Sequence, residues 1–156
     1  GMSNIISIFK NGFYLDPAKL NSNIPISGKM FGMGNYQSSS STKSFNYCNS
    51  ETSNDIGTLI LSEVALGKQY ERINAEHITM NILNQKKCDS TKGVGQYESV
   101  DNNAILLDNV KIPMGPLKLI NKQNSLYYNE YIVYNVNQVL VKYLAIVKNV
   151  GGKSNY

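Results

Sequence analysis

Short runs rich in apolar, aromatic and β-branched residues recur along the chain, a pattern typical of β-strands. Five runs with this pattern predict strands: Thr58 to Leu66, Ala104 to Leu107, Val110 to Ile112, Leu126 to Tyr134 and Val139 to Val147. The Asp108-Asn109 pair separates the second run from the third and predicts a turn. Strands are therefore expected to make up most of the regular structure.

Helical spacing appears at the start of the chain. Ile5, Ile8 and Phe9 lie on one helical face and predict an amphipathic helix over Ser3 to Asn11, whose first residue is a suitable N-cap. Gly12 is a suitable C-terminal stop for this helix.

A second helix start is predicted after the serine run at 38–41. Ser39 or Ser40 is placed to cap it. Lys43 and Tyr47, four residues apart, then lie on one face of this helix.

The order of these elements predicts an α+β fold with mainly antiparallel sheets, because the helix–strand alternation that parallel crossovers need is missing. The segment Phe13 to Lys29, which contains Pro17 and Pro25, is expected to form a long loop. Gly93 and Gly95 are expected to lie in a turn, since neither the spacing of a phosphate-binding loop nor a following helix is present.

Length and composition restrict the class of protein. A chain of 156 residues with 42% hydrophobic content suits one globular domain, here residues 2–156. No run approaches the ~18 apolar residues of a membrane span and no secretory signal is visible, so an intracellular protein, nuclear or cytoplasmic, is expected. Cys48 and Cys88 have no partners at metal-ligand spacing, so we expect reduced cysteines and no metal site.

The net charge of +4 is spread along the chain, and the densest cluster is only Lys86-Lys87 followed by Lys92. Tracking a nucleic-acid backbone requires positive charge gathered on one face. We therefore expect no direct nucleic-acid binding and no membrane binding. The single histidine, His77, is expected to be structural.

Candidate chemistry lies in two segments about eighty residues apart, 28–48 and 125–135. Tyr36 and Tyr47 offer flat faces for a cationic aromatic ring, and the Ser44 hydroxyl can pair with an amide. Glu130, a single carboxylate in an apolar strand, can hold a ribose hydroxyl. Together these groups predict a nucleotide pocket suited to cleavage of NAD at its nicotinamide bond.

Each of these residues also has a structural interpretation. The chain has 11 tyrosines and no tryptophan, so Tyr36 and Tyr47 are also candidates for core packing. Glu130 fits an edge strand from which its carboxylate reaches water, and a lysine at a helix start, such as Lys43, is usually solvated. The residue pattern alone leaves both interpretations open.

The chain resembles the catalytic domain of the poly(ADP-ribose) polymerases from about Asn4 to about Lys148. Several motifs share order and spacing with that family, which makes a chance match very improbable. They are NIISIFKNG (Asn4 to Gly12), SGKMFGMGNY (Ser27 to Tyr36), TKSFNYC (Thr42 to Cys48), GTLILSEVALG (Gly57 to Gly67), STKGVGQ (Ser90 to Gln96), LLDNVKIPMG (Leu106 to Gly115) and LYYNEYIVYN (Leu126 to Asn135).

The resemblance implies the ADP-ribosyltransferase fold, NAD as co-substrate and roles for five side chains. Glu130 resembles the catalytic carboxylate and Tyr47 the residue that stacks on nicotinamide. Tyr36 resembles the residue that lines the ribose side, where it is expected to be catalytic as well as to bind NAD. Ser44 resembles the ligand of the nicotinamide amide, and Lys43 the cation beside the reacting ribose. By the same resemblance, the loop after Gly12 is the donor loop over the pocket mouth.

The chain departs from the family pattern around this site. Asn35 and the run Gln37 to Ser39 are more polar than the family's residues there, and Tyr14 lies near a place where some members carry an arginine. The family's His-Gly element, on a central strand of the N-terminal portion of the domain, is absent from this sequence. These departures predict weaker NAD binding and a strand supplied by a second copy or another polypeptide.

Two functions are therefore considered. The first is an NAD-dependent transferase that passes ADP-ribose to an acceptor protein, to itself or to a growing polymer, with Glu130 also activating the attacking hydroxyl. The second is a catalytically inactive fragment that acts as a structural or interaction module. Glu130 favours the first, whereas the absent His-Gly element favours the second.

Overall fold

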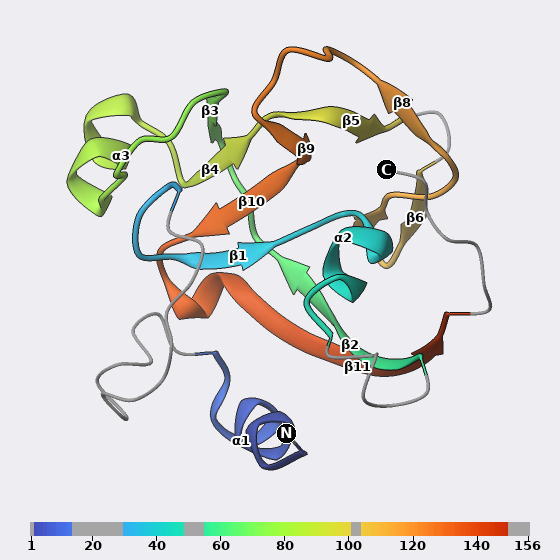
Figure 1. Cartoon of the computed structure of the whole chain (residues 1–156). Coiled ribbons are helices and arrows are strands. Elements are labelled where there is room, and N and C mark those ends of the chain that lie inside the picture. The colour runs from blue at the N-terminus through green and yellow to red at the C-terminus, as the bar shows by residue number, and fades with distance from the viewer. Residues whose placement is uncertain (1, 14–29, 49–54, 101–103, 150–156) are drawn as a thin grey trace.

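The structure is a computed structural model of the chain, and it describes residues 2–13, 30–48, 55–100 and 104–149. Strands predominate in these parts of the chain (Figure 1). The helices are α1 (Met2–Asn11), α2 (Ser41–Phe45), α3 (Met80–Lys86) and the 3₁₀ helix η4 (Val136–Gln138). The strands are β1 (Asn35–Gln37), β2 (Ile56–Val64), β3 (Gln69–Arg72), β4 (Ser90–Gly93), β5 (Gly95–Ser99), β6 (Ile105–Leu107), β7 (Val110–Ile112), β8 (Leu117–Leu119), β9 (Leu126–Tyr128), β10 (Glu130–Val133) and β11 (Val139–Lys148).

The central sheet has the order β1-β10-β4-β3. Strand β10 pairs antiparallel with β1 on one side and with β4 on the other, so that Glu130 lies opposite Gly93. Strand β3 is parallel to β4 and connects to it through α3, so the expectation that no helix–strand alternation for a parallel crossover is present is wrong at this place. Glu130 is therefore on an interior strand, and its interpretation as an edge-strand residue is wrong.

Three smaller sheets surround the central one. Strands β8, β5 and β9 form one of them, β2 and β11 form a long antiparallel ribbon with an irregularity between Val141 and Tyr143, and β6 and β7 form a hairpin. Asp108 and Asn109, the two residues of the hairpin turn, both have positive φ, as tight two-residue hairpins require. The expected turn is thus confirmed, and so is the sheet-rich α+β fold with few short helices.

The predicted strand from Leu126 to Tyr134 is two strands. The first, β9, pairs with β5, and the second, β10, pairs with β4, so the chain changes sheets at Asn129. Two consecutive polar residues, Asn129 and Glu130, interrupt the apolar run at this point. They do not show by themselves that the chain changes sheets, because the partner strands are distant in sequence.

Gly93 and Gly95 end β4 and begin β5, with only Val94 between them. The expectation of a turn is therefore wrong, because both glycines belong to strands and only Val94 separates them. A Cβ on Gly93 would meet the Phe31 ring at 2.4 Å, and one on Gly95 would meet the Tyr128 carbonyl carbon at 2.3 Å. These glycines are required because other parts of the chain approach the backbone closely.

The hydrophobic core lies on one face of the central sheet. Its buried members are Phe31, Ile78, Leu83, Ile132 and Tyr134. Phe31 lies in the turn before β1, Ile78 precedes the N-cap of α3, and Leu83 lies within α3. Ile132 lies in β10, and Tyr134 directly follows that strand. The core therefore anchors β10 and the start of β1, the two strands that carry Glu130 and Tyr36.

Local sequence signals predicted two of the three α-helices found in the described residues. The predicted first helix is α1, but it begins at Met2, so the expectation that Ser3 is its N-cap is wrong. Gly12, with φ of 75°, donates its N–H to the Ile8 carbonyl at 2.8 Å, as a C-terminal stop does. Ser40 is the N-cap of α2, but this helix ends at Phe45, before Tyr47. The predicted loop at 13–29, with Tyr14, lies almost entirely outside the described residues.

Helix α3 was missed, although its boundaries carry ordinary signals. Thr79 is the N-cap and accepts the Ile82 N–H, and Lys87 ends the helix in the left-handed region with φ of 54°. A helix of seven residues shows too few turns for its periodicity to be distinguished from noise. Its position against the central sheet depends on Leu83, which is fully buried.

Candidate active site

Residues from β1, α2 and the β9–β10 segment surround one cavity of about 400 Å³. Its lining comprises all five residues that the sequence singled out, together with Met30, Gln37, Ser38 and Leu126. The five are Tyr36, Lys43, Ser44, Tyr47 and Glu130. Segments that are distant in the sequence thus meet around one space.

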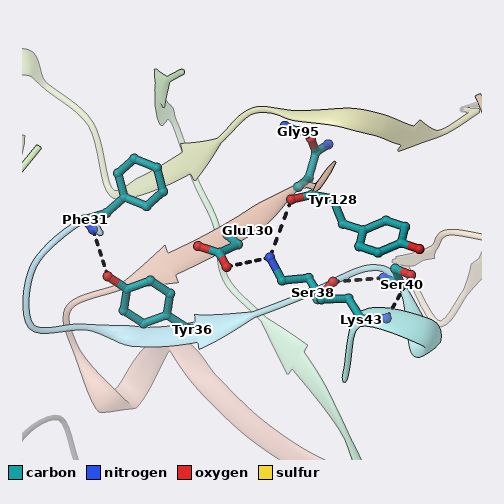
Figure 2. Close-up of polar contacts among 9 residues, drawn as sticks. Phe31, Tyr36, Ser38, Ser40, Lys43, Gly95, Tyr128 and Glu130 are labelled. Atoms are coloured by element: carbon teal, nitrogen blue, oxygen red, sulfur yellow. Dashed lines mark hydrogen bonds and ion pairs between the residues drawn. The ribbon is translucent and has the colours of Figure 1, made fainter. Parts of the chain in front are cut away.

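An ion pair joins the two sides of this cavity. The Lys43 Nζ lies 2.5 Å from Glu130 Oε1 and 3.5 Å from the Tyr128 carbonyl oxygen (Figure 2). The two side chains are only 13% and 12% exposed, so each charge is largely removed from water. Each ion offsets much of the desolvation cost of the other. The alternative of a solvated Lys43 is therefore excluded.

The cap of α2 positions Lys43. The Ser40 side chain accepts the Lys43 backbone N–H at 3.3 Å, and the Ser40 N–H in turn donates to Ser38 Oγ at 3.1 Å. This satisfies one of the backbone donors that a helix N-terminus leaves without an intrahelical partner. The serine run is thus a structured turn that directs the Lys43 side chain towards β10 (Figure 2).

The Tyr36 hydroxyl is engaged with the backbone. It accepts the Phe31 N–H at 2.9 Å and donates to the Gly32 carbonyl at 3.0 Å. Burial raises the pKa of the Tyr36 phenol above its usual value, and the nearby Glu130 carboxylate raises it further against the opposing effect of the Phe31 N–H. Tyr36 therefore stays neutral and fixes the turn before β1, while it also lines the cavity.

Ser44 and Tyr47 lie on the α2 side of the cavity. Tyr47 is just beyond the helix, where its N–H donates to the Ser44 carbonyl, and its side chain is 75% exposed. Tyr47 thus combines a place in the cavity lining with a large solvent-exposed surface, which leaves its ring accessible to a ligand. Core packing is excluded for this tyrosine.

One wall of the cavity is polar, as the sequence predicted. Gln37 and Ser38 line it, and Gln37 Nε2 donates to the buried Asn35 side chain at 2.7 Å. Met30 and Leu126 add an apolar part to the lining that sequence reasoning missed. No local pattern identifies them, because each is an ordinary apolar residue until the fold brings it to the cavity.

Comparisons with known proteins identify the family of the chain. A family model for the poly(ADP-ribose) polymerase catalytic domain matches residues 1–149. The chain belongs to this family. It is 38% identical over 151 residues to poly(ADP-ribose) polymerase 2 of Homo sapiens, 39% over 145 residues to poly(ADP-ribose) polymerase 2-B of Oryza sativa subsp. japonica, and 38% over 147 residues to poly(ADP-ribose) polymerase 1 of Gallus gallus.

These matches cover 94%, 92% and 94% of this chain but only 25%, 23% and 14% of the three relatives. The chain therefore spans a quarter or less of the length of these relatives. The poly(ADP-ribose) polymerase family uses NAD as its substrate.

Two further observations concern ligands and membranes. In the part of the chain that the structure describes, no three His, Cys, Asp or Glu side chains lie close enough together to hold a metal ion. Among the helices of that part, none has the length and apolar character needed to cross a membrane.

Proposed function

We propose that this chain is an NAD-dependent ADP-ribosyltransferase domain of the poly(ADP-ribose) polymerase type. It transfers ADP-ribose from NAD to a protein side chain, to itself or to a growing polymer, and releases nicotinamide. One observation carries this proposal. A largely buried carboxylate, Glu130, is paired with Lys43 at the wall of a cavity that Tyr36, Ser44 and Tyr47 also line.

The chemistry explains why a carboxylate is needed there. When the bond between nicotinamide and ribose breaks, positive charge develops at the anomeric carbon, as in glycoside hydrolysis. A carboxylate hydrogen-bonded to the ribose 2-hydroxyl is bound more strongly as that charge develops. Glu130 takes this role, and its low exposure strengthens the interaction because little water screens it.

The other side chains bind and orient the substrate. Tyr47 supplies an accessible ring for stacking on the nicotinamide, and the Ser44 hydroxyl pairs with the nicotinamide amide. Tyr36 lines the ribose side, where its hydroxyl is neutral and held by the backbone. Lys43 holds the Glu130 carboxylate in one direction and remains beside the reacting ribose.

The substitution Glu130→Gln tests the proposal. It keeps the shape of the side chain and removes the charge, so nicotinamide release from NAD and automodification should fall by at least about 100-fold. The fold should be nearly unchanged in far-ultraviolet circular dichroism. Glu63→Gln, which makes the same chemical change at a surface ion pair with Lys142, is the matched control and should retain activity.

Wild-type activity in Glu130→Gln would contradict the assignment of Glu130. Absence of nicotinamide release from the wild-type chain, together with intact binding of a partner protein, would instead support the inactive structural or interaction module.

A further inference from the structure

A second polar network lies behind the cavity, on the opposite face of the central sheet. In an antiparallel pair, residues directly opposite each other point to the same face. Glu130 is opposite Gly93, and a Cβ on Gly93 would point at Phe31 and at Leu126, which lines the cavity. Lys92 and Tyr131, the next pair along β4 and β10, therefore point away from it.

Asn129 links this rear face to the strand that carries Glu130. Its side chain is 3% exposed and makes three polar contacts. Oδ1 accepts the Gly95 N–H at 2.8 Å, and Nδ2 donates to Glu98 Oε1 at 2.9 Å and lies 3.4 Å from the Tyr131 hydroxyl. The cavity chemistry described above uses none of these groups.

The contact with Gly95 occurs where the chain changes sheets. Strand β9 pairs with β5 and β10 pairs with β4, so the backbone ladder is interrupted between Tyr128 and Glu130. The Asn129 side chain supplies a hydrogen bond to β5 at this break. Gly95 approaches the Tyr128–Asn129 peptide so closely that a Cβ there would lie 2.6 Å from the Asn129 nitrogen. Gly95 thereby contacts both the Asn129 side chain and the Tyr128–Asn129 peptide, one residue before Glu130.

An ion pair in turn holds Glu98, which accepts the hydrogen bond from Asn129. Lys92 Nζ lies 2.6 Å from Glu98 Oε1, the same oxygen that accepts from Asn129, and 3.3 Å from Glu71 Oε1. Lys92 is 15% exposed, so this ion pair is partly shielded from water. Side chains from β3, β4 and β5 therefore converge on the residue before Glu130.

We propose that Asn129 is a positioning residue for Glu130 and that Glu98, held by Lys92, keeps Asn129 in place. The carbonyl of Tyr128 contacts Lys43, and the next peptide leads into Glu130, so rotation of the Tyr128–Asn129 peptide would disturb both ends of the catalytic ion pair. This inference rests on the proposed function, because it assigns a purpose to the direction of the Glu130 carboxylate. Misplacement by about 1 Å can reduce a rate by about 100-fold.

A reciprocal exchange of amide and carboxylate tests the inference. Asn129→Asp keeps the acceptor for Gly95 but removes the donor and places a second carboxylate against Glu98. Its kcat for nicotinamide release should fall about 10-fold, with KM for NAD changed less than about 2-fold. Adding Glu98→Gln returns an amide donor to the pair and keeps the local charge, so kcat should recover at least about half of the wild-type value.

A spectroscopic measurement makes the test independent of catalysis. The side-chain carboxyl ¹³C resonance of Glu130, identified by its loss in Glu130→Gln, should shift in Asn129→Asp and return in the double variant. Glu98→Ala, at a partly exposed position where folding should be retained, should also shift it and lower kcat about 10-fold. Glu63→Gln should leave both kcat and the resonance unchanged.

An unmoved Glu130 resonance in Asn129→Asp and Glu98→Ala would overturn the positioning role. The positioning role would also be overturned if Asn129→Asp with Glu98→Gln remained as slow as Asn129→Asp alone. Restoring the amide–carboxylate pair repairs a lost hydrogen bond but does not repair a change that is merely destabilising. A wild-type chain that releases no nicotinamide would refute the proposed function, and the resonance would still decide whether Asn129 positions Glu130.

Discussion

At the scale of single residues, the site depends on two largely buried charges that compensate each other. The Lys43 Nζ lies 2.5 Å from Glu130 Oε1, and each side chain is less than one-sixth exposed. A buried ion pair contributes little net stability, but removing one partner leaves the other charge without compensation. The pair is therefore sensitive to single changes in a way that a surface ion pair is not.

Lys43→Met should lower the free energy of unfolding by about 3 kcal/mol, because the Glu130 carboxylate would remain buried without its cation. Adding Glu130→Gln should recover most of that loss, since no buried charge then remains. Urea denaturation of both variants measures the difference. A Lys43→Met variant as stable as the wild type would show that water reaches Glu130 freely.

A benzamide-type mimic of nicotinamide tests the two residues on the α2 side of the cavity. Its binding to Ser44 and Tyr47 should raise the melting temperature, and at ~100 times its dissociation constant the stabilisation is about 2.7 kcal/mol. Replacing both residues, Ser44→Ala with Tyr47→Ala, should abolish the shift. If the shift survives in that double variant, the mimic binds outside this cavity.

At the scale of elements, short segments position the site and their ends matter more than their length. Helix α2 has only five residues, and the Ser40 cap holds its first turn. The hydroxyl of Ser40 accepts the backbone N–H of Lys43, the residue that reaches Glu130. Loss of the cap would therefore loosen the catalytic ion pair as well as the helix.

Ser40→Ala should reduce the free energy of unfolding by about 1 kcal/mol, the usual effect of losing an N-cap. It should also lower the rate of nicotinamide release, because Lys43 would no longer be held from its own backbone. Ser40→Asp, which keeps an acceptor at the cap, is the matched control and should retain most of the stability. Equal stability of the alanine variant and the wild type would mean that β1 alone orders the serine turn.

At the scale of the whole molecule, the hydrophobic core and the polar network behind the cavity both contain groups that make stability depend on alkaline pH. Burial raises the pKa of Tyr134 to about 12, against an ordinary value of 10.0. Burial lowers the pKa of Lys92, but its hydrogen bond to Glu98 and the charges of Glu98 and Glu71 outweigh this effect, so the net direction is upward. The pKa of Tyr36 is also raised, chiefly by burial.

These groups predict a loss of stability above pH 10. In the unfolded chain they release their protons near their ordinary pKa values, whereas the folded chain retains them to higher pH. Between about pH 10 and 12 the folded state therefore binds more protons, and its free energy of unfolding falls as pH rises. Tyr134 alone should contribute on the order of 2 kcal/mol to this fall.

Tyr134→Phe should flatten the decline above pH 10. It should also lower stability at pH 7 by about 1–2 kcal/mol, because the buried Phe31 carbonyl loses the hydroxyl that donates to it at 2.6 Å. Urea denaturation between pH 7 and pH 11.5 provides the measurement. An unchanged slope above pH 10 in this variant would show that Tyr134 does not titrate in that window.

Local sequence determined the elements whose signals are contained within a few residues. Gly12 ends α1, Ser40 caps α2, and the Asp108-Asn109 pair makes the hairpin turn, because capping and turn formation use backbone groups only a few positions apart. Motif order along the chain was also sufficient for the family, and it pointed to the five candidate residues that line the cavity. These properties are readable because each depends on residue type and spacing alone.

Tertiary structure alone decided how these elements meet. Three features depend on contacts between residues far apart in sequence. They are the division of the Leu126–Tyr134 run at Asn129, the pairing of Lys43 with Glu130 and the polar network behind Glu130. Asn129 is an unremarkable polar residue in the sequence, and it acquires a specific place only because β9 and β10 belong to different sheets. Such contacts depend on which strands become neighbours, and burial of the whole core, not local periodicity, sets that arrangement.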